Sequence, residues 1–215
     1  MHLRFARGFD IDAARRHLRR EDPALASWMR RLPPLEPPPR WRGQFDTVDV
    51  LARAILYQQL SGKAAATIVG RVEAACGEKR LDAAALMRLS DAEIRACGVS
   101  GNKTLALRDL AARGQRGELP AARAFQHLDD ETIVERLTAV RGIGRWTVEM
   151  LLIFTLGRPD VLAVDDLGLR RGVQVLDGLA DMPTTRELAA RGEVWGPFRS
   201  CASMLLWRIA DQRAA

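Results

Sequence analysis

The segment AVRGIGRWTVEML, residues 139–151, places two glycines between two helical patterns. A glycine inside a helix costs roughly 1 kcal/mol relative to alanine, so Gly142 and Gly144 indicate backbone positions with a special requirement. Gly142 can adopt the conformation that ends one helix, and Gly144 can open the next with no side chain in the way. Such a hairpin presents successive amides and a helix N-terminus, which suit a phosphate. Taken alone, however, the two glycines favour a plain helix–turn–helix.

The composition is that of a globular chain. Of its 215 residues, 47% are hydrophobic and 28% are charged. No apolar run approaches the roughly 20 residues that a membrane span needs, and the N-terminal MHLRFARGFD lacks the apolar core of a signal peptide. Cys76, Cys97 and Cys201 lie far apart, which argues against a disulfide framework, a zinc site or a cysteine-bound iron–sulfur cluster. We therefore expect a reducing, cytoplasmic setting and no membrane.

The chain is basic, with a formal net charge of +6 and a pI of about 10.0. Most of the excess lies in residues 1–44, which contain ten arginines against five acidic residues. This balance permits a polyanionic partner such as DNA.

Helical patterns recur along the chain and strand patterns do not, which predicts an all-α fold. Asp22 before Pro23 is a typical helix start, and Ser90 with Glu93 and Thr184 with Glu187 are capping boxes. LPPLEPPPR, residues 32–40, is a stiff connector that is neither helix nor inner strand. The helical segments expected from periodicity are 10–18, 22–32, 46–60, 62–76, 100–114, 129–140, 145–157 and 197–212.

A pair of carboxylates follows the glycine segment, in RPDVLAVDDLGLRRG, residues 158–172. An aspartate before a helix is usually an N-cap. One aspartate suffices for a cap. The pair Asp165 and Asp166 therefore leaves a second carboxylate, close in sequence to the predicted phosphate site.

These features together resemble the helix–hairpin–helix DNA glycosylases, and most closely their 3-methyladenine DNA glycosylase II branch, which repairs alkylated bases. The resemblance rests on LTAVRGIGRWTVEMLLIF (137–154) followed by DVLAVDDLGLRRG (160–172). AILYQQLSGKAAATI (54–68) and WGPFRSCASMLLW (195–207) resemble further segments of that branch, and DIDAARRHLRREDPAL (10–25) resembles the short N-terminal helices of its compact members. The likeness covers nearly the whole chain.

The resemblance implies two helical subdomains that flank a DNA-binding cleft. Residues 1–40 would form N-terminal helices and a connector that pack with the C-terminal helices. Residues 41–135 would form a central subdomain, and residues 136–215 would contain the hairpin, the catalytic aspartate and the last helices. The family mostly acts as monomers on double-stranded DNA.

Residue roles follow from the same resemblance, position by position. Asp166 matches the catalytic carboxylate, and Asp165 is then expected to cap the next helix or to support Asp166. Gln59 falls at the wedge position that fills the gap left by a flipped nucleotide. The other expected DNA contacts are Ser61, Gly142, Gly144, Arg145 and Thr147. The expected base pocket contains Tyr57, Trp146, Met150 and Trp207. The backbone carbonyls of Thr138, Val140 and Ile143 match those that hold Na⁺ or K⁺ in this family, and no other cofactor is expected.

The chemistry is consistent with these residue types. A carboxylate stabilises the positive charge that develops on C1′ as the base departs, and an alkylated purine is cationic and leaves readily. Family members with lyase activity carry a lysine two residues after the second hairpin glycine, where this chain has Trp146. The lysines are Lys63, Lys79 and Lys103. Lys103 could contact a backbone phosphate, but we expect it to lie on a solvated helix face. Met150 replaces a pocket tyrosine of some relatives, which predicts a more open pocket.

Two other functions fit parts of the pattern. One is a glycosylase for other damaged or mismatched bases, which the missing lysine and the missing cysteine cluster disfavour. The other is a non-catalytic helix–hairpin–helix DNA-binding module, which needs neither Asp166 nor two pocket tryptophans.

Overall fold

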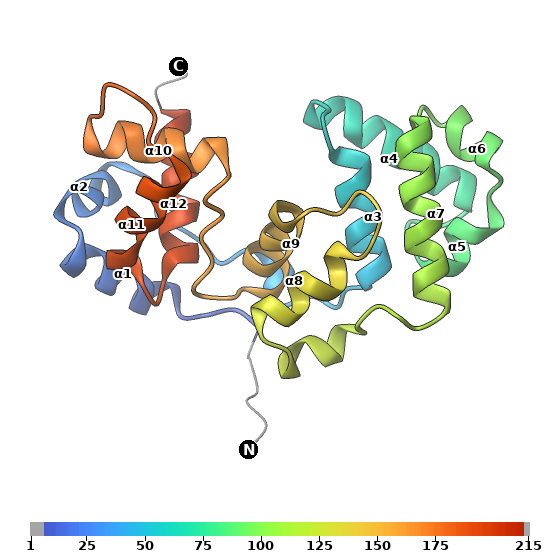
Figure 1. The fold of residues 1–215 in the computed structure, drawn as a ribbon, viewed down its shortest axis with the longest axis horizontal. Coiled ribbons are helices and arrows are strands. Elements are labelled where there is room, and N and C mark those ends of the chain that lie inside the picture. Colours follow the sequence, from blue (N-terminus) through green and yellow to red (C-terminus); the bar gives the residue numbers. More distant parts are fainter. Residues whose placement is uncertain (1–6, 213–215) are drawn as a thin grey trace. The chain divides into compact units, whose positions relative to one another are not determined.

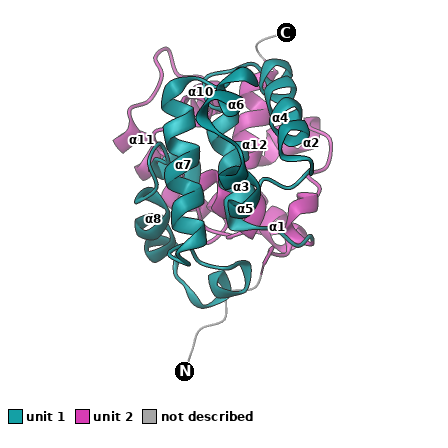
Figure 2. Cartoon of the chain, turned by 90° about the vertical axis from the view of Figure 1, so that its right-hand side faces the viewer, with its two compact units in different colours: residues 1–5, 43–148 teal, residues 6–42, 149–215 magenta. Residues whose placement is uncertain are grey.

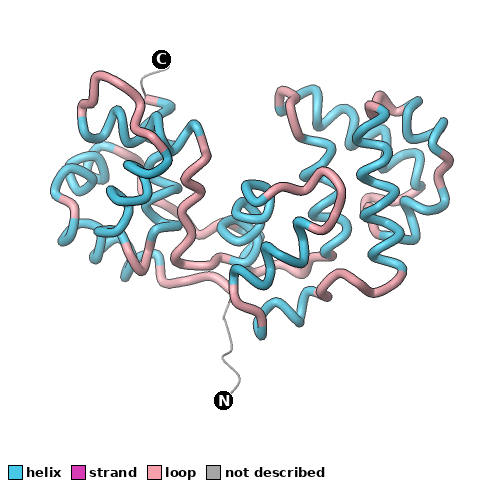
Figure 3. Tube along the Cα trace, in the orientation of Figure 1, coloured by secondary structure: helices cyan, strands magenta, loops and turns pink. Residues whose placement is uncertain are grey.

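The computed structural model describes residues 7–212, and these contain helices and loops without a strand (Figure 3). The predicted all-α class is confirmed. The chain divides into two compact units (Figure 2). Among the described residues, unit 1 contains 43–148, and unit 2 is formed by 7–42 together with 149–212. Among the helices described, none is both long enough and apolar enough to cross a membrane.

Unit 1 is a cluster of helices around α7 (Gly101–Gln115), which packs against α3, α5 and α6 (Figure 1). Its fully buried side chains include Leu51, Ile55, Leu107 and Leu110. The other elements of the unit are α3 (Thr47–Tyr57), α4 (Gly62–Cys76), α5 (Ala83–Arg88), α6 (Asp91–Ala96), the 3-10 helix η2 (Ala122–His127), α8 (Asp130–Thr138) and the start of α9 (Arg145–Leu151).

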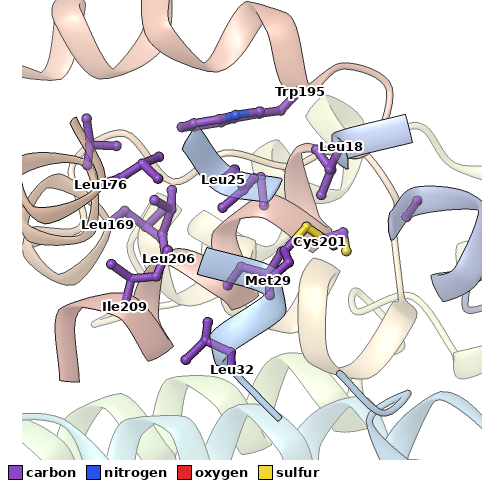
Figure 4. Packing of buried hydrophobic residues seen from close by; sticks show 14 of the residues in the cluster. Leu18, Leu25, Met29, Leu32, Leu169, Leu176, Trp195, Cys201, Leu206 and Ile209 are labelled. Atoms are coloured by element: carbon purple, nitrogen blue, oxygen red, sulfur yellow. The ribbon is translucent and has the colours of Figure 1, made fainter. Parts of the chain in front are cut away.

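Unit 2 is formed by both ends of the described chain. Its helices α10 (Leu167–Asp177) and α12 (Arg199–Asp211) pack against each other, and α1 (Ile11–Glu21) and α2 (Pro23–Arg31) pack against them. The shared core contains Leu18, Leu25, Leu169, Trp195 and Leu206 (Figure 4). The remaining elements are η1 (Pro39–Trp41), the π-helix η3 (Leu152–Leu156), α11 (Thr185–Arg191) and η4 (Gly192–Trp195).

The boundary between the units at 148/149 falls within α9. The hairpin, residues 140–144, therefore belongs to unit 1, whereas the sequence interpretation grouped it with the C-terminal helices. The hairpin belongs to unit 1 because it packs against α7.

Local sequence signals predicted most helix ends correctly. Asp22 caps α2 with Pro23 in its first turn, and both capping boxes are present. The helix expected over 46–60 ends at Tyr57, which leaves residues 58–61 as a loop. The proline connector ends in a 3-10 turn, η1, that was not expected. The three cysteines are buried and free.

The helix expected over 145–157 changes to a π-helix at Leu152. The N-terminal segment is tied to this turn, because Gly8 N–H donates to Leu156 O (3.0 Å) and Trp41 Nε1 donates to Ile153 O (2.8 Å). Gly157 ends the π-helix with φ +63°, and a Cβ there would lie 2.5 Å from the Gly8 backbone. Glycine is therefore required at this close approach.

Candidate active site

The hairpin between α8 and α9 is a tight turn. Ile143 N–H donates to Val140 O at 3.1 Å, and Gly142 has φ +78°. A positive φ at the third residue of such a turn is typical of type II and favours glycine. The sequence predicted that Gly142 ends the preceding helix; that helix ends at Thr138 with Ala139 as its cap, and the positive φ of Gly142 forms the turn that follows. Gly144 opens α9, since its carbonyl accepts from Thr147 N–H (3.0 Å) and Val148 N–H (3.3 Å).

Buried side chains and α7 hold the hairpin in place. Val140 and Ile143 are buried, and a Cβ on Gly142 would lie 3.2 Å from Cβ of Ala106 on α7. Arg141 N–H donates to Oδ2 of Asp109, also on α7, at 2.8 Å. Burial alone would raise the pKa of Asp109, but the bonds from Arg141 N–H and from the Arg113 guanidinium outweigh it and lower that pKa. The Asp109 carboxylate is thus a charged anchor for the hairpin backbone.

Asp166 stands at the N-terminus of α10. Its Oδ1 accepts from Leu169 N–H at 2.8 Å and from Trp207 Nε1 at 2.8 Å. The first bond makes Asp166 the N-cap of the helix. Of the two roles expected for Asp165, that of the cap was wrong, because the residue directly before α10 reaches the N–H three positions on. Support of Asp166 by Asp165 stays a prediction. Asp165 is exposed. The same side chain, Asp166, is therefore both the N-cap of α10 and the candidate catalytic carboxylate.

Trp207 on α12 lies beside this carboxylate. Its ring is 5.5 Å, centroid to centroid, from the ring of Phe154 in the π-helix η3, and it also packs against the core of unit 2. Gly168 makes room for the indole, since a Cβ there would lie 2.7 Å from Cδ1 of Trp207 and 3.0 Å from Oδ1 of Asp166. The sequence indicated neither Phe154 nor Gly168. The one available signal was Gly168 itself, the first glycine of VDDLGLRRG (164–172), because it interrupts a helical pattern.

The other residues expected in the base pocket are distributed over the two units. Tyr57, in the last turn of α3, and Trp146, in the first turn of α9, belong to unit 1 and are 45% and 46% exposed. Met150 belongs to unit 2, where it packs against the core together with Trp207. The structure brings Asp166 and Trp207 into direct contact.

The expected DNA contacts of the hairpin differ in exposure. The Arg145 side chain is half exposed and pairs with both carboxylate oxygens of Glu131 at 3.0 and 2.6 Å. Thr147 is buried, and its N–H is used within the first turn of α9. Its side chain is therefore not presented at the surface. A Cβ on Gly144 would meet no atom within 4 Å, so the backbone there is open.

The loop between α3 and α4 carries two more expected contacts. Gln59 is exposed and has φ +55°. Ser61 caps α4, since its Oγ accepts from Ala64 N–H at 3.3 Å. Lys103 on α7 donates from Nζ to the carbonyls of Leu56 (2.9 Å) and Gln58 (2.7 Å). The expectation that Lys103 lies on a solvated face was wrong, because the end of α3 leaves carbonyls that need a donor.

The carbonyls expected to hold a monovalent cation suit such an ion chemically. Thr138 is the last residue of α8, where carbonyls lack helical partners and carry the negative end of the helix dipole. Val140 O accepts one hydrogen bond, from Ile143, and a carbonyl oxygen has two lone pairs. The neighbouring Gly142 carbonyl accepts from Gln58 Nε2 at 2.9 Å instead.

The geometry defines a helical protein with a glycine hairpin and, in its other unit, a helix-capping aspartate beside a tryptophan. Comparison with known proteins identifies the family. The chain belongs to the HhH-GPD superfamily of base excision DNA repair proteins, whose family model matches residues 52–197.

Its relatives include DNA-3-methyladenine glycosylase 1 of Schizosaccharomyces pombe, 40% identical over 74% of this chain and 71% of the relative. The solved structure of the S. pombe 3-methyladenine DNA glycosylase Mag1 in complex with abasic DNA matches with a TM-score of 0.81 and 34% identity, covering 91% of this chain and 95% of that one. A DNA-3-methyladenine glycosidase of Bacillus halodurans also gives 0.81, with 33% identity over 92% of this chain and 88% of that one.

Proposed function

We propose that this protein is a monofunctional DNA glycosylase that hydrolyses the N-glycosidic bond of alkylated bases in double-stranded DNA. The bases are of the 3-methyladenine and 7-methylguanine type, and the names of its relatives give the first of these. The observation that carries the proposal is the Asp166 carboxylate, whose Oδ1 accepts from the backbone N–H of Leu169 and from the indole N–H of Trp207. We further propose that the protein acts as a monomer.

The roles of Asp166 follow from charge. As the bond between C1′ and the base breaks, positive charge develops on the sugar, and a fixed carboxylate stabilises it without reorganisation. The same carboxylate can take the proton of the attacking water. The base leaves with the bonding electrons, and a cationic alkylated purine becomes neutral as it departs. No strong general acid is needed.

The remaining roles concern DNA. The open backbone at Gly144 suits a phosphate, and contacts of this kind position the duplex without reading its sequence. Gln59, exposed in the loop between α3 and α4, suits the gap that a flipped nucleotide leaves. Na⁺ or K⁺ on the carbonyls of Thr138, Val140 and Ile143 would add positive charge near the same phosphate.

The test is release of bases from DNA treated with a methylating agent. Asp166→Asn retains an oxygen that can accept both N–H bonds but removes the charge, so we expect release to fall by about 10²–10³-fold. Binding to abasic DNA should change little. Asp165→Asn is the matched control, since it removes a neighbouring exposed carboxylate. A wild-type protein that releases no methylated base, or an Asp166→Asn variant as fast as wild type, would refute the proposal.

A further inference from the structure

The loop from Gln58 to Ser61 contains an unfavourable backbone conformation. Gln59, at φ +55°, is the one non-glycine residue with a positive φ among residues 7–212. This conformation costs a residue with a side chain about 1–2 kcal/mol, and it persists when the surroundings hold it. Contacts from outside the loop must therefore fix Gln59.

Lys103 supplies the first of these contacts. Its ammonium group lies beneath the end of α3 and donates to the carbonyls of Leu56 and Gln58, on either side of the last helical residue. Burial lowers the pKa of Lys103. A half-buried ammonium that satisfies two carbonyls fixes the backbone directly before Gln59.

Gln58 supplies the second contact. Its side-chain amide crosses to the hairpin and donates from Nε2 to Gly142 O at 2.9 Å. Gly142 is the residue whose positive φ forms the turn. Gln58 is thus held at its backbone by Lys103 and holds the hairpin through its side chain.

One face of α7 supports both loops. Lys103, Ala106 and Asp109 are spaced three residues apart and so lie along one side of the helix. Lys103 contacts the loop before Gln59, Ala106 lies against Gly142, and Asp109 accepts from Arg141 N–H. A single rigid helix therefore sets the distance between the loop and the hairpin.

We infer that Gln58 and Lys103 are positioning residues for base flipping, which fix the wedge residue Gln59 at a set distance from the phosphate-binding hairpin. The inference rests on the proposed function. When the hairpin holds a phosphate, the loop then presents Gln59 at a defined place along the same strand. A wedge that moved independently of the hairpin would fill the gap in the duplex less often.

The experiment separates flipping from binding and from folding. DNA with 2-aminopurine beside a methylated purine reports unstacking by fluorescence, and single-turnover assays report base release. The variants are Gln58→Met and Lys103→Met, which retain chain length but remove the donors. The matched controls are Gln115→Met and Lys79→Met, because both residues are exposed in unit 1.

We expect Gln58→Met and Lys103→Met to lower the unstacking signal and the release rate together, by about tenfold or more. Affinity for undamaged DNA should stay within about threefold of wild type, since the phosphate contacts are unchanged. The double variant should lose less than the product of the two single losses, because both act on one loop. Both controls should behave as wild type.

Two results would overturn the inference. One is wild-type unstacking in Gln58→Met, which is informative even if Lys103→Met does not fold. The other is a wild-type protein that unstacks no base. A wild-type protein that unstacks the lesion without releasing a base would refute the proposed function, and the loss of unstacking in Gln58→Met would still support the positioning role.

Discussion

Gly168 shows how one missing side chain sets up the candidate catalytic group. It lies in the first turn of α10, where an added Cβ would approach Cδ1 of Trp207 to 2.7 Å. The indole would have to move, and its N–H would leave the Asp166 carboxylate. The carboxylate would then lose one of the two donors on Oδ1.

We therefore predict that Gly168→Ala lowers the release of methylated bases by about tenfold or more, the effect of losing a hydrogen bond to a charged group. Gly70→Ala is the matched control, because Gly70 is also a helical glycine but a Cβ there meets nothing within 4 Å. That control should retain activity and gain up to about 1 kcal/mol of stability. Equal release rates in the two variants would show that the Trp207 contact is dispensable.

At the scale of elements, Asp22 joins four helical segments of unit 2. It is buried, caps α2 through Leu25 N–H (2.9 Å), and accepts from Trp195 Nε1 (2.8 Å) and the Arg191 guanidinium (2.6 Å). Arg191 also pairs with Asp177 of α10. Burial alone would raise the pKa of Asp22, but these bonds outweigh it and hold the pKa below its ordinary value of 3.8.

A carboxylate with a lowered pKa in the folded state stabilises the protein above the unfolded-state pKa, and this stability is lost as the pH falls through the folded-state value. We predict that Asp22→Asn lowers the free energy of unfolding by about 1.5–3 kcal/mol at pH 7. The difference from wild type should begin to shrink below about pH 4, where the carboxylate of the unfolded chain protonates, and shrink further as the pH falls toward the lower pKa of the folded state. Thermal unfolding of wild type and Asp22→Asn between pH 7 and pH 3 measures how this difference in stability changes with pH.

The exposed helix cap Asp10 provides the comparison for Asp22. Asp10→Asn should change the stability at pH 7 by about 0.5 kcal/mol or less, since asparagine also caps and the site is solvated. A pH-independent difference for Asp22→Asn would contradict the role of its charge.

The elements also show what the sequence could predict. Caps such as Asp22 and Ser90, and the turn glycine Gly142, act within a few residues and leave a local pattern. Trp207 contacts Asp166 across 41 positions and Gln58 contacts Gly142 across 84, so no local pattern marks these pairs. The resemblance supplied roles for single residues, but the hydrogen bonds that hold them required the fold.

At the scale of the whole molecule, the distribution of amines bears on the reaction. The lysines of the sequence are Lys63, Lys79 and Lys103, and all three belong to unit 1. Lys103 is committed to two carbonyls. The position of the lyase lysine in related enzymes is occupied by Trp146.

We predict that turnover leaves an intact strand with an abasic site, because Trp146, at the position of the lyase lysine, has no amine that could form an imine with the sugar. The measurement is borohydride trapping during turnover, followed by denaturing electrophoresis of protein and DNA. Strand breaks should form only after alkaline treatment. A trapped covalent adduct would assign lyase activity to the protein.

The interrupted order of unit 2 has a consequence for synthesis on the ribosome. The described part of unit 1, residues 43–148, is continuous in sequence and can complete its contacts as it emerges. The helices that cover α1 and α2 begin at residue 167, more than a hundred residues after α2 ends at Arg31. At the usual pace of translation this delay is on the order of ten seconds. For that time the apolar side chains of Leu18 and Leu25 have no core to enter. Aggregation or chaperone capture during translation should therefore begin at the first two helices.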